Sequence, residues 1–329
     1  MFAFKYISSL RPHGVALACA LAALAGACGD DETVVPDVPP PALHGIGGWT
    51  EFDLYAVGEA GTILRYRGIE WRPVSSPTSH GLRDVVGFSA SSAYVVGDRG
   101  TALRFDGTAF RTEPSGTTQD LRALWGSSST NLIAVGRGGV ILANDGGGWQ
   151  LETSPTGDDL EGVWALSTGE AYAVGAAGTV VHRVAGVWSL DAPFTSSRLR
   201  AIWADKPRDW FAVGDNGEIW RQDGSGWTAM TSPRSDNLHD VFGSDSAYVF
   251  AVGDADSVLF YDGVAWSPQV PTVADRLEAI WATVCALPPA ETAAGRTALH
   301  CSNTYFAGTT SVVTRFTLLN SYEILNDPR

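Results

Sequence analysis

The stretch that decides the fold is AYAVGAAGTVV, residues 171–181, in which a Gly-x-x-Gly turn joins two short apolar runs. Read alone, this pattern also resembles the step from a strand into a phosphate-holding loop. The pattern is repeated, however, and its first glycine recurs with a constant spacing at Gly58, Gly97, Gly136, Gly175, Gly214 and Gly253. A weaker seventh copy contains Gly308, at a wider spacing from Gly253 than the constant one. A period this strict predicts a repeat architecture.

Other positions keep the same register. A leucine opens each of seven units, at Leu43, Leu82, Leu121, Leu160, Leu199, Leu238 and Leu277. Large aromatic residues follow four positions later, at Trp125, Trp164, Trp203, Phe242 and Trp281. Others follow 28 positions after the leucine, at Trp71, Phe110, Trp149, Trp188, Trp227 and Trp266. Because large flat side chains fill the space between packed sheets, we expect these periodic aromatic residues to lie in the core.

Each unit is interpreted as four short antiparallel strands. A unit as short as the one from Leu160 to Arg198 leaves no room for a crossover helix, so parallel strand pairing is excluded. Seven such units predict an all-β fold, a seven-bladed β-propeller of four-stranded antiparallel blades over residues 43–329. A solenoid is the alternative, but neither end of the repeat resembles a cap. Gly175 and Gly178 are then expected to be hairpin turn residues rather than a phosphate site.

The composition limits the partners. The chain of 329 residues carries a formal net charge of −14 and contains no run of basic residues. An acidic surface repels phosphate backbones, so we expect no nucleic-acid partner. The acidity also serves solubility.

The N-terminal part of the chain, up to Ala42, is expected to lie outside the fold. Residues 1–27 read as a signal peptide, with Lys5 and Arg11 ahead of an apolar segment too short to span a bilayer comfortably. The AGAC sequence ending at Cys28 resembles the lipobox of bacterial lipoproteins, which implies a lipid on that cysteine. An ordinary secretory signal cleaved nearby is the alternative. Residues 28–42 are acidic and proline-rich, which is typical of a stiff tether.

The two remaining cysteines of an exported chain, Cys285 and Cys301, are expected to form a disulfide. They flank most of an insertion at about residues 283–304, between the first and second strands of the seventh unit. Two interpretations stay open: drift in a surface loop, or a binding loop held rigid by its bridge.

The complete unit resembles two kinds of propeller repeat. An Asp-Gly turn precedes the last strand, with Asp106, Asp145, Asp223 and Asp262, and resembles the BNR or Asp-box repeat of sialidase-like propellers. The AVG-xx-GTIL pattern resembles the repeats of photosystem II assembly factor propellers. The match to the Asp-box is partial, because the Ser or Thr expected two places before each aspartate is absent. Both resemblances imply a fold and leave the function open.

No catalytic or metal-binding set is predicted. The arginine triad and tyrosine–acid pair of a sialidase cannot be assigned to any position, and the histidines lack ligand spacing. We therefore expect no metal and no cofactor.

The second position of each unit is chemically unusual. It is polar or charged in all seven units, at His44, Arg83, Arg122, Glu161, Arg200, His239 and Glu278. The starts of the innermost strands encircle one mouth of a propeller's central channel, so these residues are predicted to form a ring there. They are interpreted either as a binding mouth for an anion or peptide, or as solvated strand ends with local ion pairs.

These observations predict an exported, monomeric, non-catalytic propeller that binds a protein or glycan at the cell envelope. It would be held by lipid at the outer membrane or cell surface, or face the periplasm. Two alternatives remain: a sialidase-like glycoside hydrolase, and an assembly or stability factor for a membrane complex.

Overall fold

Apolar alternation and glycine turns fold each repeat unit into a meander of antiparallel strands. In a computed structural model, residues 41–166, 169–269, 276–282, 303–308 and 313–317 are described. The fourth unit is representative, with β13 (Leu160–Ala165), β14 (Ala171–Gly175), β15 (Val180–Val184) and β16 (Val187–Leu190) paired in that order. Each sheet is called a blade below and is numbered by its unit.

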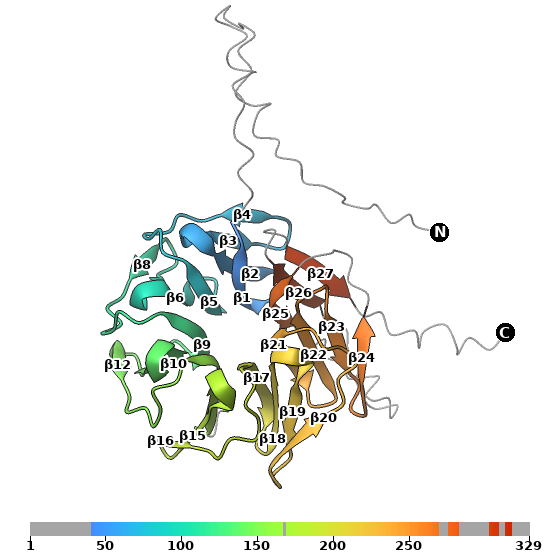
Figure 1. Cartoon of the computed structure of the whole chain (residues 1–329). Helices are drawn as coiled ribbons and strands as arrows, with labels where there is room; N and C mark the ends of the chain where they lie inside the picture. The colour runs from blue at the N-terminus through green and yellow to red at the C-terminus, as the bar shows by residue number, and fades with distance from the viewer. Residues whose placement is uncertain (1–40, 167–168, 270–275, 283–302, 309–312, 318–329) are drawn as a thin grey trace, which may run out of the picture. The chain divides into compact units, whose positions relative to one another are not determined.

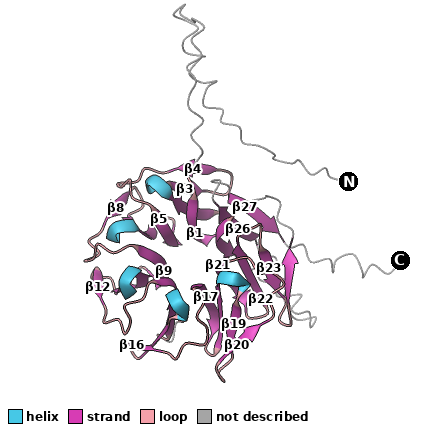
Figure 2. Cartoon of the chain, viewed as in Figure 1, coloured by secondary structure: helices cyan, strands magenta, loops and turns pink. Residues whose placement is uncertain are grey.

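Five other units form blades of the same topology, which Figures 1 and 2 show arranged around a central axis. Their strands are β1 (Leu43–Thr50), β2 (Asp53–Gly58), β3 (Ile63–Tyr66), β4 (Trp71–Pro73), β5 (Leu82–Ser89), β6 (Ser92–Gly97), β7 (Ala102–Phe105), β8 (Phe110–Thr112), β9 (Leu121–Ser128), β10 (Asn131–Gly136), β11 (Ile141–Asn144), β12 (Trp149–Leu151), β17 (Leu199–Lys206), β18 (Asp209–Gly214), β19 (Ile219–Gln222), β20 (Trp227–Met230), β21 (Leu238–Asp245), β22 (Tyr248–Gly253), β23 (Val258–Tyr261) and β24 (Trp266–Gln269). The propeller of four-stranded antiparallel blades is therefore confirmed.

The predicted number of seven such blades is wrong, because the structure has six. The seventh unit contributes a three-stranded sheet of β25 (Leu277–Ala282), β26 (Asn303–Gly308) and β27 (Val313–Thr317). After β27 its sequence contains no glycine, whereas a glycine lies in the turn before the outermost strand of every other unit, at Gly68, Gly107, Gly146, Gly186, Gly224 and Gly263. The described residues of this unit contain no fourth strand.

Several sequence predictions fall outside the described residues. The signal peptide, Cys28 and nearly all of the tether lie there, as do Cys285 and Cys301 with most of the insertion. None of the helices in the described part of the chain has the length and apolar character of a membrane-spanning segment.

The Gly-x-x-Gly motif forms the turn between the second and third strands, as predicted. In blade 4 it is a single 3₁₀ turn, η4 (Ala176–Gly178), in which Ala177 and Gly178 have φ of 54° and 71°. A Cβ on Gly178 would lie 2.0 Å from the carbonyl oxygen of Thr195, and one on Gly175 would lie 2.0 Å from that of Asp159. The backbone of the neighbouring loop therefore occupies the space that a phosphate would need. The equivalent turns are η1 (Glu59–Gly61), η2 (Asp98–Gly100), η3 (Arg137–Gly139) and η5 (Asp215–Gly217).

The core consists of separate apolar layers between successive blades. Between blades 3 and 4, Trp125, Ile133, Leu160 and Trp188 share one buried cluster. Trp164 packs against Trp125, Trp203 and Phe242, with ring centroids 5.8 to 6.4 Å apart. Trp125, Trp188 and Trp203 are buried, as their spacing predicts, whereas Trp164 and Phe242 are half-buried and line the central channel.

The ring is closed by side-chain packing between blade 1 and the sheet of the seventh unit. Leu43 and Ile46 of β1 share a buried cluster with Ala279 of β25 and Ala307 of β26. All four strands of blade 1 come from residues 43–73, so the described residues contain no blade shared between the two ends of the chain.

Candidate functional site

The seven residues at the second position of each unit lie together at one mouth of the central channel. They line one hollow of about 430 Å³, together with Ala42, Glu59 and Arg276: His44, Arg83, Arg122, Glu161, Arg200, His239 and Glu278. Each comes from the start of an innermost strand, which is why one residue per unit reaches the same place. These seven residues are called the mouth ring below.

Two arginines and one histidine of the mouth ring pair within their own blade. Arg83 donates to both carboxylate oxygens of Asp98 at 2.8 and 2.9 Å, and Arg200 donates to Asp215 at 2.5 Å. His239 Nε2 lies 2.8 Å from Asp254 Oδ1. Each acid follows its partner by 15 positions, just after the second strand of the blade. Burial opposes ionisation of Asp98, but its hydrogen bonds and charge attraction to Arg83 outweigh burial and lower its pKa.

Arg122 cannot pair in this way, because the residue 15 positions later is Arg137. Its guanidinium instead reaches across to blade 4 and donates to Glu161 Oε2 at 2.8 Å. Arg276, which precedes the last strand start, lies 2.8 Å from Glu278 and 3.2 Å from Asp254. The arginines of the mouth ring are therefore ion-paired, and the mouth mixes both charges.

His44 differs from its neighbours in the mouth ring. Its buried Nε2 has no hydrogen-bond partner among the described residues. Burial and the nearby charge of Arg83 lower its pKa, which favours the neutral imidazole at pH 7. The mouth thus contains two buried polar atoms without a hydrogen bond in the described part of the chain, His44 Nε2 and Glu161 Oε1, that a bound molecule could still satisfy.

Behind the mouth ring, apolar side chains line the channel together with polar groups. The channel encloses about 350 Å³ between aliphatic residues of the strand starts and the aromatic side chains Trp125, Trp164, Phe242 and Trp281. A cavity of this size lined by both apolar and polar groups is typical of a ligand site.

Two aspartates lie among these side chains, and sequence reasoning missed them. Asp84 and Asp240 occupy the third position of units 2 and 6 and line the channel. The signal was present in the repeat, because the same position is Gly45, Ala123, Gly162, Ala201 and Ala279 in the other units. Burial raises the pKa of each carboxyl to about 7.

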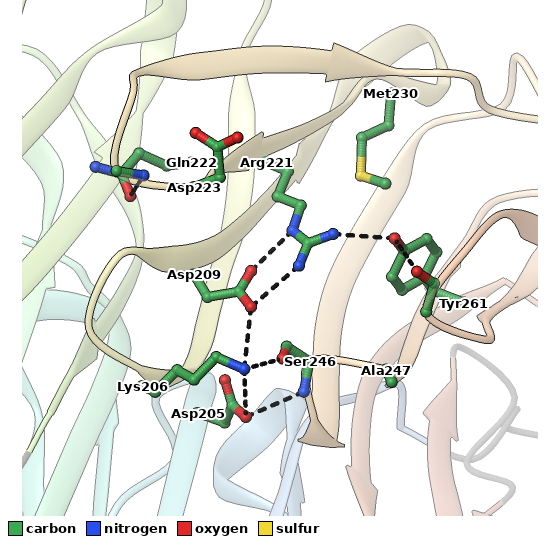
Figure 3. A network of polar contacts seen from close by, with 12 residues as sticks. Asp205, Lys206, Asp209, Arg221, Gln222, Asp223, Met230, Ser246, Ala247 and Tyr261 are labelled. Atoms are coloured by element: carbon green, nitrogen blue, oxygen red, sulfur yellow. Dashed lines mark hydrogen bonds and ion pairs between the residues drawn. The ribbon is translucent and has the colours of Figure 1, made fainter.

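At the opposite ends of the strands, the blades carry a second set of charges. Figure 3 shows Arg221 donating to both oxygens of Asp209, at 2.8 and 3.0 Å, and to the Tyr261 hydroxyl of blade 6 at 3.0 Å. Lys206 lies 2.5 Å from Ser246 Oγ and 3.3 Å from Asp209. Because these contacts cross from blade 5 to blade 6, the cluster joins the two blades and is structural.

The aspartates of the Asp-Gly turns serve the turns themselves. Asp106 Oδ1 accepts hydrogen bonds from the backbone N–H groups of Thr108 and Ala109, both at 2.9 Å. Asp262 Oδ1 accepts the equivalent pair of bonds from Val264 and Ala265. Nowhere in the described ranges do three or more His, Cys, Asp or Glu side chains gather closely enough to hold a metal ion.

The fold and site define a β-propeller with a channel mouth of mixed charge. Neither a scan of protein-family models nor a search of curated proteins finds a match. Solved structures are similar in fold. A structure described as YCF48 bound to D1 peptide is 17% identical, with a TM-score of 0.65 over 84% of this chain and 92% of that one. YCF48 from Cyanidioschyzon merolae is 18% identical, with a TM-score of 0.66 over 86% and 97%. The WD40 propeller domain of Doa1 is 10% identical, with a TM-score of 0.68 over 86% and 95%. At these identities the comparisons show the fold alone.

Proposed function

We propose that this protein is a non-catalytic propeller that binds a segment of a protein partner at the mouth ring. The observation that carries the proposal is the convergence of seven polar side chains from seven strands on one hollow that opens into the channel. The similarity to YCF48, recorded in complex with a D1 peptide, supports a protein rather than a glycan as the partner.

The pairing of the mouth ring indicates how a partner would be recognised. Since Arg83, Arg122 and Arg200 already hold carboxylates, a bound segment gains little from net charge. It would compete for individual hydrogen bonds instead, at a mouth that offers both donors and acceptors. Such a mouth favours a segment that carries both hydrogen-bond donors and acceptors. It selects that segment by the geometry of the hydrogen bonds.

The test is a triple substitution, Arg83→Ala with Arg122→Ala and Arg200→Ala. The matched control removes three exposed arginines away from the mouth, with Arg72→Ala, Arg104→Ala and Arg111→Ala. The wild type and both variants are each crosslinked to their neighbours in the native envelope, and the proteins captured with each are identified. We expect the mouth variant to lose partners that the control retains, and partners retained equally by both variants would refute the proposal.

We also propose that the propeller is exported and anchored through lipid on Cys28. The motivation is the lipobox-like AGAC sequence and the proline-rich tether that follows it. Replacement of Cys28 by Ser should release the protein from the membrane fraction. A variant that stays in that fraction at wild-type size would contradict the anchor.

A role as an assembly or stability factor for a membrane complex is a specific form of this function. The YCF48 structures favour it over the glycoside hydrolase alternative. Co-purification of one defined membrane complex, lost in the mouth variant, would support it. Turnover of chromogenic glycosides by the purified protein would instead support the hydrolase.

A further inference from the structure

Asp84 and Asp240 each connect two neighbouring blades. Asp84 Oδ1 accepts a hydrogen bond from the N–H of Val85 at 2.7 Å, while Oδ2 accepts one from Leu124 in blade 3 at 2.8 Å. Asp240 repeats this arrangement four units later. It accepts from Val241 in its own strand at 2.8 Å and from Ile280 in the sheet of the seventh unit at 2.9 Å.

The two carboxylates lack a cationic partner. Their hydrogen bonds come from backbone N–H groups, and no ion pair to either is found among the described residues. The negative charge of Asp84 is also felt at Asp240, where it makes ionisation more difficult. Two negative charges in one channel repel each other, and each is costly to desolvate. A carboxylate that takes up a proton becomes neutral, so neither the repulsion nor the desolvation cost applies to it.

The charged groups that face this pair are those of the mouth ring. Asp84 is flanked by Arg83 on its own strand, by His44 on β1 and by Arg122 on β9, all lining the same channel. Around Asp240 lie His239 on its own strand, Arg200 on β17 and Glu278 on β25, while Glu161 on β13 completes the ring. Arg83, Arg122 and Arg200 are held by carboxylates, so their charges are already compensated.

We propose that Asp84 and Asp240 form a proton-responsive pair of inter-blade bonds, which makes the propeller more stable when its surroundings acidify across neutrality. Each event is the uptake of one proton from solvent by one carboxylate, giving a neutral acid that still offers an oxygen to a backbone N–H group. The channel loses up to two negative charges as a result.

The direction follows from linkage. A carboxyl whose pKa is about 7 in the fold, and about 4 in an unfolded chain, binds protons more tightly when folded. Its contribution to stability is complete below the unfolded pKa, falls as the pH rises from about 4 towards 7, and is gone at the top of the titration just above 7. His44 acts in the opposite direction below neutrality because its pKa is lowered, so the informative window lies between about pH 6.5 and about pH 8.5.

The experiment compares urea unfolding midpoints of the full propeller across this window. We expect the wild-type midpoint to fall as the pH rises, Asp84→Asn and Asp240→Asn each to remove part of the slope, and the double variant to flatten it. Asp98→Asn is the matched control, because the lowered pKa of Asp98 places its titration well below the window. That control is expected to shift the midpoint equally at every pH.

A second measurement keeps the proposal testable if the double variant does not fold. Carbon-13 NMR of the aspartate carboxyls in the folded wild type should show two groups that titrate near neutrality. In Asp84→Asn the remaining titration of Asp240 should move to lower pH, because a like charge has been removed. The proposal is overturned if no aspartate titrates between pH 6 and 8, or if the wild-type slope persists in both single variants.

Discussion

Arg65 and Asp53 form a bidentate ion pair inside blade 1, with both nitrogen–oxygen distances at 2.7 Å. Only 6% of the Arg65 side chain and 11% of the Asp53 side chain are exposed. The same guanidinium donates to the carbonyl of Ala90 in blade 2 at 2.9 Å and lies over the rings of Tyr55 and Phe105. One side chain therefore joins two blades while neutralising a buried charge.

Replacement of Arg65 by Met should lower the free energy of unfolding by about 3 kcal/mol, because it leaves the buried Asp53 carboxylate without its cationic partner. Chemical unfolding at pH 7 measures the loss. The control is Arg72→Met, which breaks an exposed pair with Glu70 and should cost less than about 1 kcal/mol. Equal effects of the two substitutions would show that burial of the first pair has no energetic consequence.

Replacement of Gly178 by Ala should destabilise the propeller by about 2 to 4 kcal/mol, since the residue has positive φ and no room for a Cβ. Gly157→Ala is the matched control, because a Cβ there meets nothing within 4 Å and its φ is not positive. Thermal unfolding of the two variants distinguishes them. If Gly178→Ala is as stable as the control, the turn does not need its glycine.

The pair of Arg83 and Asp98 predicts a loss of stability in acid. Because the pKa of Asp98 is lowered in the fold, its contribution is present above the ordinary carboxyl pKa and disappears as the pH falls below it. We expect Asp98→Asn to cost about 1 kcal/mol at pH 7 and progressively less as the pH falls through the lowered pKa of Asp98. Unfolding midpoints measured from pH 7 down into acid test this. A cost that is unchanged in acid would mean that charge is not its source.

The sequence also predicts a disulfide between Cys285 and Cys301, which lie outside the described residues. A non-reducing peptide map should contain the two cysteines in one crosslinked fragment. Their replacement by Ser should lower stability by about 3 kcal/mol on the chain-entropy model. Free thiols at both positions in protein purified without reductant would contradict the bridge.

The repeat period predicted more of the molecule than any single motif did. It predicted the blades, the hairpin role of Gly175 and Gly178 and the aromatic core, because each depends on local spacing. It also brought the mouth ring together, since residues one period apart occupy equivalent places.

What the period could not predict depends on departures from it. The ion pairs of Arg83 and Arg200 depend on the residue 15 positions further along, Asp98 or Asp215, which belongs to another strand connection. Asp84 and Asp240 interrupt a position that is otherwise Gly or Ala, and their significance depends on how deep in the channel the strand start lies. The seventh unit also lacks the turn glycine that precedes the outermost strand elsewhere, and a period alone does not show the effect of that absence.

The contact between Leu43 of blade 1 and Ala279 of the last sheet has a consequence for engineering. Each four-stranded blade is one contiguous piece of chain, and the seam is made of packed side chains with no strand exchanged across it among the described residues. The order of the blades around the axis could therefore be kept while the chain is opened elsewhere. A circular permutant that begins in the loop after β12 and carries a linker across the present seam should assemble the same ring from a different starting blade.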